Sequence, residues 1–399
     1  MTGASARPTS AAVIGTGFVG AQHVEALRRI GVDVAIVAAS ADDRARTAAQ
    51  ALDVRRWTAD WASAVSDPGI DVVHVCVPND LHRPVVMAAL DAGKHVVGEK
   101  PLALDLAEGR ELADAARRSD RVAVLCHNYR FFPMVAEMRL RVAAGDVGAV
   151  HAIRGAYLQD WLVSADATNW RIDATRGGRS RTIADIGTHW VDLAETVAQC
   201  RLQAVMAEVA TIYARRPAHA HARTFTATAD ATEEWVDVDT EDQAGLLLRF
   251  EGGVTGVLSL SQVAAGHSND LELSIDGAAG SATWRQEQPD QLRLARNGTL
   301  ELVPRSPASL SPGARHLARL PAGHNEGWAD ALRNLLAAAY ATIRGDRSAE
   351  DGAAAPLPSF DDGVRHLAFV EAALQSAAAG RWVSIDEVMK QQPSAVEVS

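Results

Sequence analysis

The segment Ala11-Ala12-Val13-Ile14-Gly15-Thr16-Gly17-Phe18-Val19-Gly20-Ala21 decides the fold. A short apolar run leads into the glycine pattern G-x-G-x-x-G, and a helix-period pattern follows over residues 22–30. The first glycine of this pattern permits a tight turn, the second lets the backbone approach a pyrophosphate, and the third lets a helix pack on a strand. The free N–H groups at the helix N-terminus then favour a phosphate. The segment therefore predicts a dinucleotide site formed by Gly15, Gly17, Phe18, Val19 and Gly20.

Alternating strand and helix patterns extend from this segment to about residue 130. Nearly continuous apolar runs predict buried strands, and helix-period runs such as 83–92 separate them. This alternation is typical of a doubly wound parallel sheet. The predicted strands are 11–14, 34–38, 71–77, 94–97 and 121–126.

The pattern changes after residue 135. One helix is predicted over 183–198, followed by strands at 204–213, 243–250, 253–262, 270–276 and 281–287. Strands without helices between them favour an antiparallel sheet. We therefore expect an α/β protein with a Rossmann domain (1–135) and a C-terminal α+β domain (136–399) that carries a large, mainly antiparallel open sheet. A final helix at about 363–379 is expected to pack back on the body, with loose segments at 214–232 and 345–359.

The composition restricts the class of partner and the compartment. Lysine plus arginine (39) against aspartate plus glutamate (50) gives a net charge of −11, which argues against binding to nucleic acid or to an anionic membrane. The N-terminus has no signal-peptide pattern, and no apolar run has transmembrane length. Three scattered cysteines predict free thiols rather than a disulfide framework. These features indicate a cytoplasmic protein.

The residue that grips the adenosine ribose is expected at the end of the second strand. Ser40 occupies that place, where an aspartate or glutamate would bond the ribose and repel a 2′-phosphate. Serine removes this repulsion, and Arg44 or Arg46 can pair with the phosphate, so NADP is open as cofactor. In the other interpretation Asp42 or Asp43 reaches the ribose and the cofactor is NAD.

Glu99-Lys100-Pro101 ends the predicted strand 94–97. Proline biases Lys100 toward an extended conformation at the carboxyl edge of the sheet, where open α/β sheets bind their ligands. A lysine at this edge can hydrogen-bond a substrate hydroxyl and assist proton transfer. The alternative is a surface lysine that merely ends a strand.

A second polar constellation lies on the predicted helix 183–198. Spacings of four and three residues place Asp185, His189 and Asp192 on one stripe. A histidine beside carboxylates suits general base catalysis. The alternatives are a solvent-facing helix side and a metal site. The separate apolar stripe expected to anchor the helix is Ile186, Trp190, Leu193, Ala194 and Val197.

We predict no metal. The helix stripe lacks a further histidine or cysteine at ligand spacing. His219 and His221 form a His-Ala-His triplet in a polar stretch, which is typical of a solvated loop.

Several motifs taken together resemble the glucose–fructose oxidoreductase/inositol dehydrogenase (Gfo/Idh/MocA) family. The motifs are residues 15–20, Glu99-Lys100-Pro101, Asn128-Tyr129-Arg130, Asp185 with His189, and residues 323–328. The resemblance implies a Rossmann domain joined to an α/β domain whose open sheet mediates oligomers, hence a homodimer or homotetramer. It also implies a Lys100-Pro101 peptide bond that is often cis.

The same resemblance assigns roles to individual residues. Lys100 matches the catalytic lysine, His189 the acid–base histidine, and Asp185 the aspartate that binds substrate and orients the site. Further cofactor contacts are implied for Pro78, Asn79, His82, Glu99 and Lys100. Further substrate contacts are implied for Asn128, Tyr129 and Arg130.

Residues 157–162 with Trp170-Arg171 resemble family members that act on glycosides and anhydrosugars such as levoglucosan. Trp161 offers an apolar face for a pyranose ring, and Gln159, Asp160 and Arg171 offer partners for hydroxyl groups. In the other interpretation the tryptophans are core anchors. In the resembled subgroup, oxidation falls at the C3 hydroxyl.

The main hypothesis is therefore a reversible, NAD(P)-dependent oxidation of a secondary alcohol on a sugar, glycoside, anhydrosugar or cyclitol. One alternative is a glycoside hydrolase or lyase that retains NAD and uses transient oxidation. The other is a non-catalytic NAD(P)-binding regulator.

Overall fold

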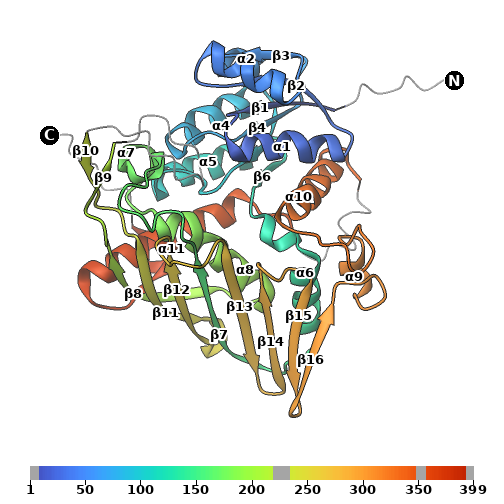
Figure 1. The fold of residues 1–399 in the computed structure, drawn as a ribbon, viewed down its shortest axis with the longest axis vertical. Coiled ribbons are helices and arrows are strands. Elements are labelled where there is room, and N and C mark those ends of the chain that lie inside the picture. Colours follow the sequence, from blue (N-terminus) through green and yellow to red (C-terminus); the bar gives the residue numbers. More distant parts are fainter. Residues whose placement is uncertain (1–8, 219–233, 347–355, 392–399) are drawn as a thin grey trace.

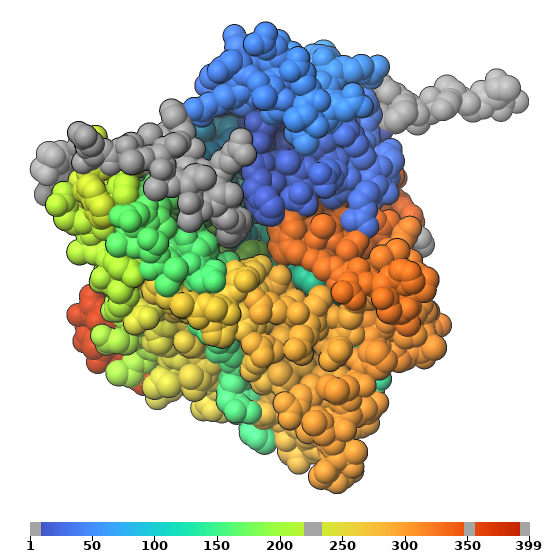
Figure 2. Space-filling view, in the orientation of Figure 1, coloured from blue at the N-terminus to red at the C-terminus, as the bar shows by residue number. Residues whose placement is uncertain are grey.

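The computed structural model describes residues 9–218, 234–346 and 356–391. Two large sheets dominate these residues, one built from the first third of the chain and one from the middle (Figure 1). Figure 2 shows the surface hollowed where the blue, orange, green and yellow segments meet.

The first sheet has six parallel strands in the order β3-β2-β1-β4-β5-β6. Its strands are β1 (Ser10–Ile14), β2 (Asp33–Ala38), β3 (Arg56–Thr58), β4 (Val72–Val75), β5 (His95–Gly98) and β6 (Ala123–Leu125). Its helices are α1 (Phe18–Arg29), α2 (Asp42–Ala51), α3 (Trp61–Ser66), α4 (His82–Asp91) and α5 (Leu106–Arg118). The predicted doubly wound parallel sheet is confirmed, with β3 added to the five expected strands.

Two helices from the end of the chain help to cover this sheet. Alternate residues of β1 face opposite sides: Ala11 and Val13 join the core under α1 and α10 (Trp328–Ile343), whereas Ala12 and Ile14 join the core under α3, α4, α5 and α11 (Phe360–Ala379). Helix α11 packs closely on α5, because a Cβ added at Gly109 would lie 2.4 Å from Cδ1 of Leu367. The last part of the chain thus contributes to the cores on both faces of the first sheet.

The second sheet has nine strands in the order β16-β15-β14-β13-β7-β12-β11-β8-β17. They are β7 (Val150–Leu158), β8 (Leu202–Ala210), β11 (Gln243–Phe250), β12 (Thr255–Ser261), β13 (Asp270–Gly277), β14 (Gly280–Arg285), β15 (Gln291–Arg296), β16 (Thr299–Pro304) and β17 (Val383–Ser384). All neighbours are antiparallel except β7 and β12, so the expected mainly antiparallel sheet is confirmed.

One face of this sheet is covered and the other is open (Figure 1). Helices α6 (Pro133–Ala143), α8 (Thr188–Ala198) and α11 lie behind it. Residues of β11 alternate between exposed and buried, as a half-covered strand requires. Leu247 of β11 and Val257 of β12 are paired across the strands and lie on the open face, each about half exposed.

Three local expectations are corrected. The helix predicted over 183–198 begins with a π-helical turn, Ile183–Gly187, before α8. The stretch expected to be loose from residue 214 contains a strand, β9 (Arg215–Pro217), paired with β10 (Trp235–Asp237). The helix expected to be final is followed by α12 (Ile385–Lys390). Residues 219–233, with His219 and His221, and residues 347–355 lie outside the described residues.

The remaining described elements are short: helices α7 (Ala174–Gly177) and α9 (Pro312–Arg315), and 3-10 turns at Asn79–Leu81, Asn128–Phe131, Trp170–Ile172 and Glu251–Gly253. The three cysteines are free thiols. Among the residues that the structure describes, none of the helices has the length and apolar character needed to cross a membrane.

Candidate active site

The glycine turn after β1 has the geometry of a phosphate cradle. Gly15 has a φ of +96°, and a Cβ there would lie 2.2 Å from the carbonyl oxygen of Cys76. A Cβ on Gly20 would lie 1.9 Å from the carbonyl oxygen of Gly15. Gly17, the N-cap of α1, has nothing within 4 Å of its Cβ position and receives no side-chain cap. The turn therefore leaves open space at the end of a helix whose first N–H groups can receive a dinucleotide pyrophosphate.

Ser40 and Arg44 lie together beyond the end of β2. Both side chains are exposed, and Nη1 of Arg44 is 3.3 Å from Oγ of Ser40. Asp42 and Asp43 are also exposed, in the first turn of α2. The position expected for the ribose thus has a hydroxyl and a guanidinium, and the carboxylates of Asp42 and Asp43 lie on the residues between them in the chain.

The expected nicotinamide side contains Pro78, Asn79 and His82. Nδ2 of Asn79 donates to the carbonyl oxygen of Gly177 over 2.9 Å, which ties this loop to helix α7. The buried ring of His82 contacts the carbonyl oxygens of Pro101 (Nδ1, 2.8 Å) and Val77 (Nε2, 3.0 Å). His82 therefore joins the loops after β4 and β5 to each other, and its ring nitrogens are occupied by protein.

The Lys100-Pro101 peptide bond is cis, as the family resemblance implied. Nζ of Lys100 donates to Oδ1 of Asp185 over 2.7 Å and to the carbonyl oxygen of Asp185 over 2.9 Å. The two side chains are 11% and 13% exposed, so the pair lies at the edge of solvent. The structure thus brings together the two motifs that the sequence placed in different domains.

A chain of buried polar groups supports the residue before this lysine. Oε1 of Glu99 is 3.1 Å from Nε2 of His23, whose Nδ1 is 2.8 Å from Nδ1 of His74. Nε2 of His74 in turn lies 2.9 Å from the hydroxyl of Tyr340 on α10. The carboxylate of Glu99 is therefore positioned by contact with the buried His23.

Asp185 is the most heavily contacted carboxylate of the site. Besides Lys100, Nε of Arg171 lies 3.4 Å from its Oδ1, and Nε2 of Gln262 donates to its Oδ2 over 2.9 Å. Burial alone would raise the pKa of Asp185, but the charges of Arg171 and Lys100 outweigh it and lower that pKa below its ordinary value. Asp185 thus stays ionised and holds the ammonium of Lys100 in place.

His189 lies on α8 close to this pair, 7% exposed. Burial lowers the pKa of His189 well below its ordinary value, and the positive charge of Lys100 acts in the same direction, although Asp185 opposes both. Its Nδ1 is 3.4 Å from Nδ1 of His127, and the ring of Tyr129 packs against it at 4.9 Å between centroids. His189 is therefore a neutral base, oriented by aromatic neighbours.

Asp192 and Arg130 form a separate ion pair behind the site. Nε of Arg130 donates to Oδ2 of Asp192 over 2.8 Å, and its Nη2 also reaches Asp362, 3.3 Å away. Asp362 is placed there by the capping box of α11, in which Oγ of Ser359 accepts from the Asp362 amide. Both members of the Arg130–Asp192 pair are buried, so the solvent-facing stripe considered for Asp192 is excluded. The guanidinium of Arg130 is engaged by protein, in contrast to the substrate contact that we expected.

Polar side chains link Tyr129 to Trp161 along one wall. The hydroxyls of Tyr129 and Tyr157 are 2.7 Å apart, and Oδ1 of Asn269 accepts from Tyr157 and from Nε2 of Gln159, each over 2.8 Å. Oε1 of Gln159 then accepts from Nε1 of Trp161 over 2.8 Å. This wall fixes the orientation of the half-buried Trp161. Asn128 lies apart from it and donates to the carbonyl oxygen of Trp328 over 3.3 Å.

Gln262, Asn269 and His127 also contact the site but were not predicted from the sequence. Each of them contacts a predicted site residue that lies far from it in the sequence. No local motif therefore indicates its role. One signal was present for Gln262, because it follows β12 directly at the strand edge.

Comparison with known proteins identifies the family of the chain. Residues 9–127 match a family model described as "Oxidoreductase family, NAD-binding Rossmann fold", and residues 135–283 match the "GFO/IDH/MocA C-terminal domain". The chain belongs to the GFO/IDH/MocA oxidoreductase family. It is thus an enzyme, an NAD-binding oxidoreductase of the sugar and cyclitol dehydrogenase type.

Relatives within the GFO/IDH/MocA family span nearly all of the chain. A levoglucosan dehydrogenase of Pseudarthrobacter phenanthrenivorans is 29% identical over 94% of this chain and 98% of its own. A solved levoglucosan dehydrogenase in complex with NADH and L-sorbose superposes with a TM-score of 0.85 at 28% identity, covering 96% of this chain and 100% of the other. An inositol dehydrogenase homologue from Azotobacter vinelandii in complex with NAD+ gives a TM-score of 0.81 at 28% identity, covering 95% and 98%.

Proposed function

We propose that the protein oxidises a secondary alcohol of a pyranose, anhydrosugar or glycoside at its C3 hydroxyl, and reduces the ketone in the reverse direction. The observation that carries this proposal is the ionised Asp185–Lys100 pair beside the neutral His189, at the carboxyl edge of a dinucleotide-binding sheet. A bound nicotinamide supplies the hydride acceptor.

In the proposed reaction the alcohol loses a hydride from carbon and a proton from oxygen. Nε2 of His189 accepts the proton, since Nδ1 of this ring is engaged with His127. The ammonium of Lys100 donates a hydrogen bond to the substrate oxygen as negative charge develops on it. Asp185 accepts a hydrogen bond from Nζ of Lys100 and so holds this group beside that oxygen.

The wall that ends at Trp161 supports a sugar ring as substrate. The indole presents an apolar face, and its N–H is already bound by Gln159, so the ring plane is fixed. Arg171, on the other side of Asp185, is held over the Trp170 ring at 4.4 Å and presents donors for hydroxyl groups. Relatives named levoglucosan dehydrogenase favour an anhydrosugar over a cyclitol.

For the cofactor, we propose that NADP is accepted as well as NAD. No carboxylate occupies the end of β2, and the Ser40 hydroxyl with the Arg44 guanidinium suits a 2′-phosphate. Gly15, Gly17, Phe18, Val19 and Gly20 would hold the pyrophosphate, with Pro78 and Asn79 beside the nicotinamide.

For the assembly, we propose a homodimer or homotetramer through the open face of the nine-stranded sheet. Leu247 of β11 and Val257 of β12 form a pair of exposed apolar side chains on that face. Light scattering of the wild type and of the Leu247→Lys, Val257→Lys double variant tests this proposal, which a monomeric wild type would overturn.

The function is tested by following reduced-cofactor formation from NAD and NADP with levoglucosan, methyl glucosides, glucose and myo-inositol. Turnover of an anhydrosugar or glucoside, with the product identified as the 3-keto compound, is the expected result. Absence of turnover on every sugar, in a protein that still binds NADH, would overturn it.

A further inference from the structure

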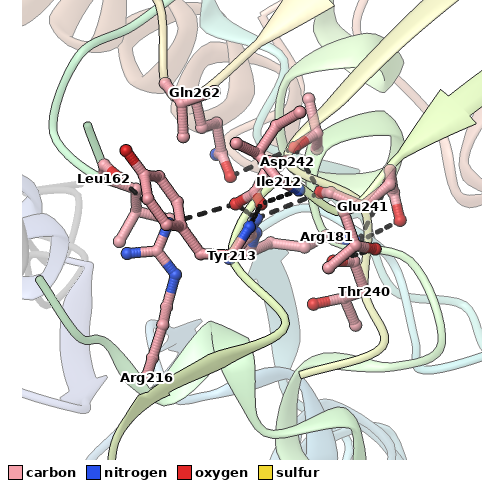
Figure 3. A network of polar contacts seen from close by, with 12 residues as sticks. Leu162, Arg181, Ile212, Tyr213, Arg216, Thr240, Glu241, Asp242 and Gln262 are labelled. Atoms are coloured by element: carbon pink, nitrogen blue, oxygen red, sulfur yellow. Dashed lines mark hydrogen bonds and ion pairs between the residues drawn. The ribbon is translucent and has the colours of Figure 1, made fainter. Parts of the chain in front are cut away.

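A buried ion cluster contacts the loop that follows Trp161, and Figure 3 shows its charged residues. The carboxylate of Asp242 is bound by the guanidinium groups of Arg181 and Arg216, and we call these three residues the Asp242 cluster. All three side chains are completely shielded from solvent. Arg181 lies just before the π-helix, Arg216 lies in β9, and Asp242 directly precedes β11.

Arg216 grips the loop itself. Its Nη1 donates to the carbonyl oxygens of Ser164 (2.8 Å) and Ala167 (3.0 Å), and its Nη2 donates to that of Leu162 (2.9 Å). Tyr213 adds a fourth carbonyl bond, since its hydroxyl donates to Val163 over 2.7 Å. The Tyr213 ring also lies 4.7 Å from the guanidinium of Arg216. One short segment, residues 213–216, thus holds most of the backbone of loop 162–167.

The other side of the cluster reaches the catalytic pair. The Asp185 amide donates to the carbonyl oxygen of Arg181 over 2.8 Å, so Arg181 lies at the base of the turn that carries Asp185. Oδ2 of Asp242 accepts from the amides of Ile212 (2.7 Å) and Tyr213 (3.0 Å). Asp242 therefore joins the segment that grips the loop to the turn that presents Asp185.

Burying the three charged side chains of the Asp242 cluster is energetically unfavourable compared with apolar packing. Burying charge costs several kcal/mol per ion unless every group is paired. Nε and Nη1 of Arg181 and Nε of Arg216 have no hydrogen-bond partner within the described part of the chain. Burial also lowers the pKa of Arg216, although Asp242 opposes this shift. Apolar packing would fill the space more favourably, but it could not bind three loop carbonyls at once.

We propose that Arg216 is a positioning residue: through loop 162–167 it sets the place of Trp161 relative to Asp185, and so determines the affinity for the sugar. This inference rests on the proposed function, because it takes Trp161 as the platform for the substrate ring. Arg216 contacts neither the predicted cofactor residues nor Lys100 or His189, so the chemistry and the cofactor affinity are left as they are.

The test compares Arg216→Met with Arg305→Met. Arg305 is also a buried arginine, bonded to the carboxylates of Asp290 and Glu326 and to the backbone carbonyls of Leu320 and His324, and none of these partners belongs to loop 162–167. In R216M we expect KM for levoglucosan, or for the fastest panel sugar, to rise about tenfold or more, with kcat within about threefold and unchanged affinity for NADH. Hydrogen exchange in a peptide spanning residues 160–170 should become faster in R216M and stay unchanged in R305M.

Tyr213→Phe is the milder second variant, and it decides the matter if R216M fails to fold. It should raise KM and loop exchange in the same direction, by less, because it removes only the bond to Val163. The proposal is overturned if exchange over 160–170 is unchanged in the folded variant, if kcat falls while KM stays, or if R305M raises KM equally. If the wild type turns over no sugar, the proposed function fails and loop exchange alone decides whether Arg216 positions the loop.

Discussion

The Nδ1 atoms of His127 and His189 lie 3.4 Å apart, in rings that meet edge to face. Two neutral imidazoles can share this contact, because one donates a proton and the other accepts it. Burial lowers the pKa of both rings, and Lys100 opposes a positive charge on either of them. In the tautomer in which Nδ1 of His189 carries the proton and donates to Nδ1 of His127, Nε2 of His189 is the atom that can accept the substrate proton.

The pH dependence of oxidation follows from this lowered pKa. His189 acts as a base only when neutral, and its pKa lies well below the ordinary value of 6.5. Activity should thus stay level as the pH falls to about 6.5 and decline only below it. The measurement is kcat/KM for the sugar against pH at saturating cofactor. A decline centred at or above pH 6.5 would contradict the assignment.

Lys100→Met removes the proposed donor to the substrate oxygen. We expect kcat to fall by about 10²-fold or more, with NADH still bound. Lys94→Met is the matched control, since Lys94 is a buried lysine of the same strand region whose Nζ donates to the carbonyl oxygens of Asp67 and Ile70, each over 2.8 Å. K94M should lower stability by about 1–3 kcal/mol and leave kcat nearly unchanged. A near-normal kcat in K100M would remove Lys100 from the chemistry.

Gly17→Ala and Gly20→Ala separate cofactor binding from folding. A Cβ on Gly17 meets no protein atom, and its φ of −67° suits alanine, so G17A should keep the wild-type melting temperature. Its methyl group would occupy the space expected for the pyrophosphate, raising Kd for NADH by about tenfold or more. G20A should destabilise the fold, because its Cβ would collide with the Gly15 carbonyl. Equal NADH affinity in G17A and wild type, by fluorescence titration, would refute this placement.

Ser40→Asp tests the cofactor proposal. A carboxylate at the end of β2 should repel a 2′-phosphate and bond a free ribose hydroxyl. The ratio of Kd for NADPH to Kd for NADH should then rise about tenfold or more. Ser40→Ala, which adds no charge, should change the ratio by much less. An unchanged ratio in S40D would show that the ribose lies elsewhere.

Arg130→Met tests the support that we assign to this residue. Removing one member of a buried pair leaves Asp192 unpaired and should lower the free energy of unfolding by about 3–5 kcal/mol. The exposed Arg118 provides a control, since Arg118→Met should change stability by less than about 0.5 kcal/mol. Denaturant unfolding monitors both. A stable R130M with a raised KM would restore Arg130 as a substrate contact.

The first sheet could be predicted because its strands are apolar runs that end in recognisable turns. The glycine turn after Ile14 and the Lys-Pro step after Gly98 both mark the carboxyl edge. Strand β3 was missed because Arg56 and Trp57 are exposed on a three-residue edge strand, where burial leaves no pattern. Strand β7 was missed because polar and small residues interrupt it, as in His151-Ala152-Ile153-Arg154.

Only the site residues that belong to a local sequence motif could be predicted. Lys100, Asp185 and His189 are recognisable from their spacing and neighbours. The helical spacing of Asp192 did not predict its partner Arg130, which Asp362 also contacts. Both residues come from distant segments, and helical periodicity does not indicate which segments pack against a helix. The same limit applies to Gln262 and to Arg216, whose bonds run mainly to backbone carbonyls that any sequence offers.

The placement of α10 and α11 affects how the chain folds during synthesis. The sheet of residues 10–125 emerges from the ribosome first, yet apolar residues on both of its faces are covered by helices that end at residues 343 and 379. We therefore expect the residues of the first sheet to expose apolar surface, and to be prone to aggregation, until α10 and α11 have been synthesised. Shortening the chain before α11 should yield an aggregating product rather than a smaller nucleotide-binding protein.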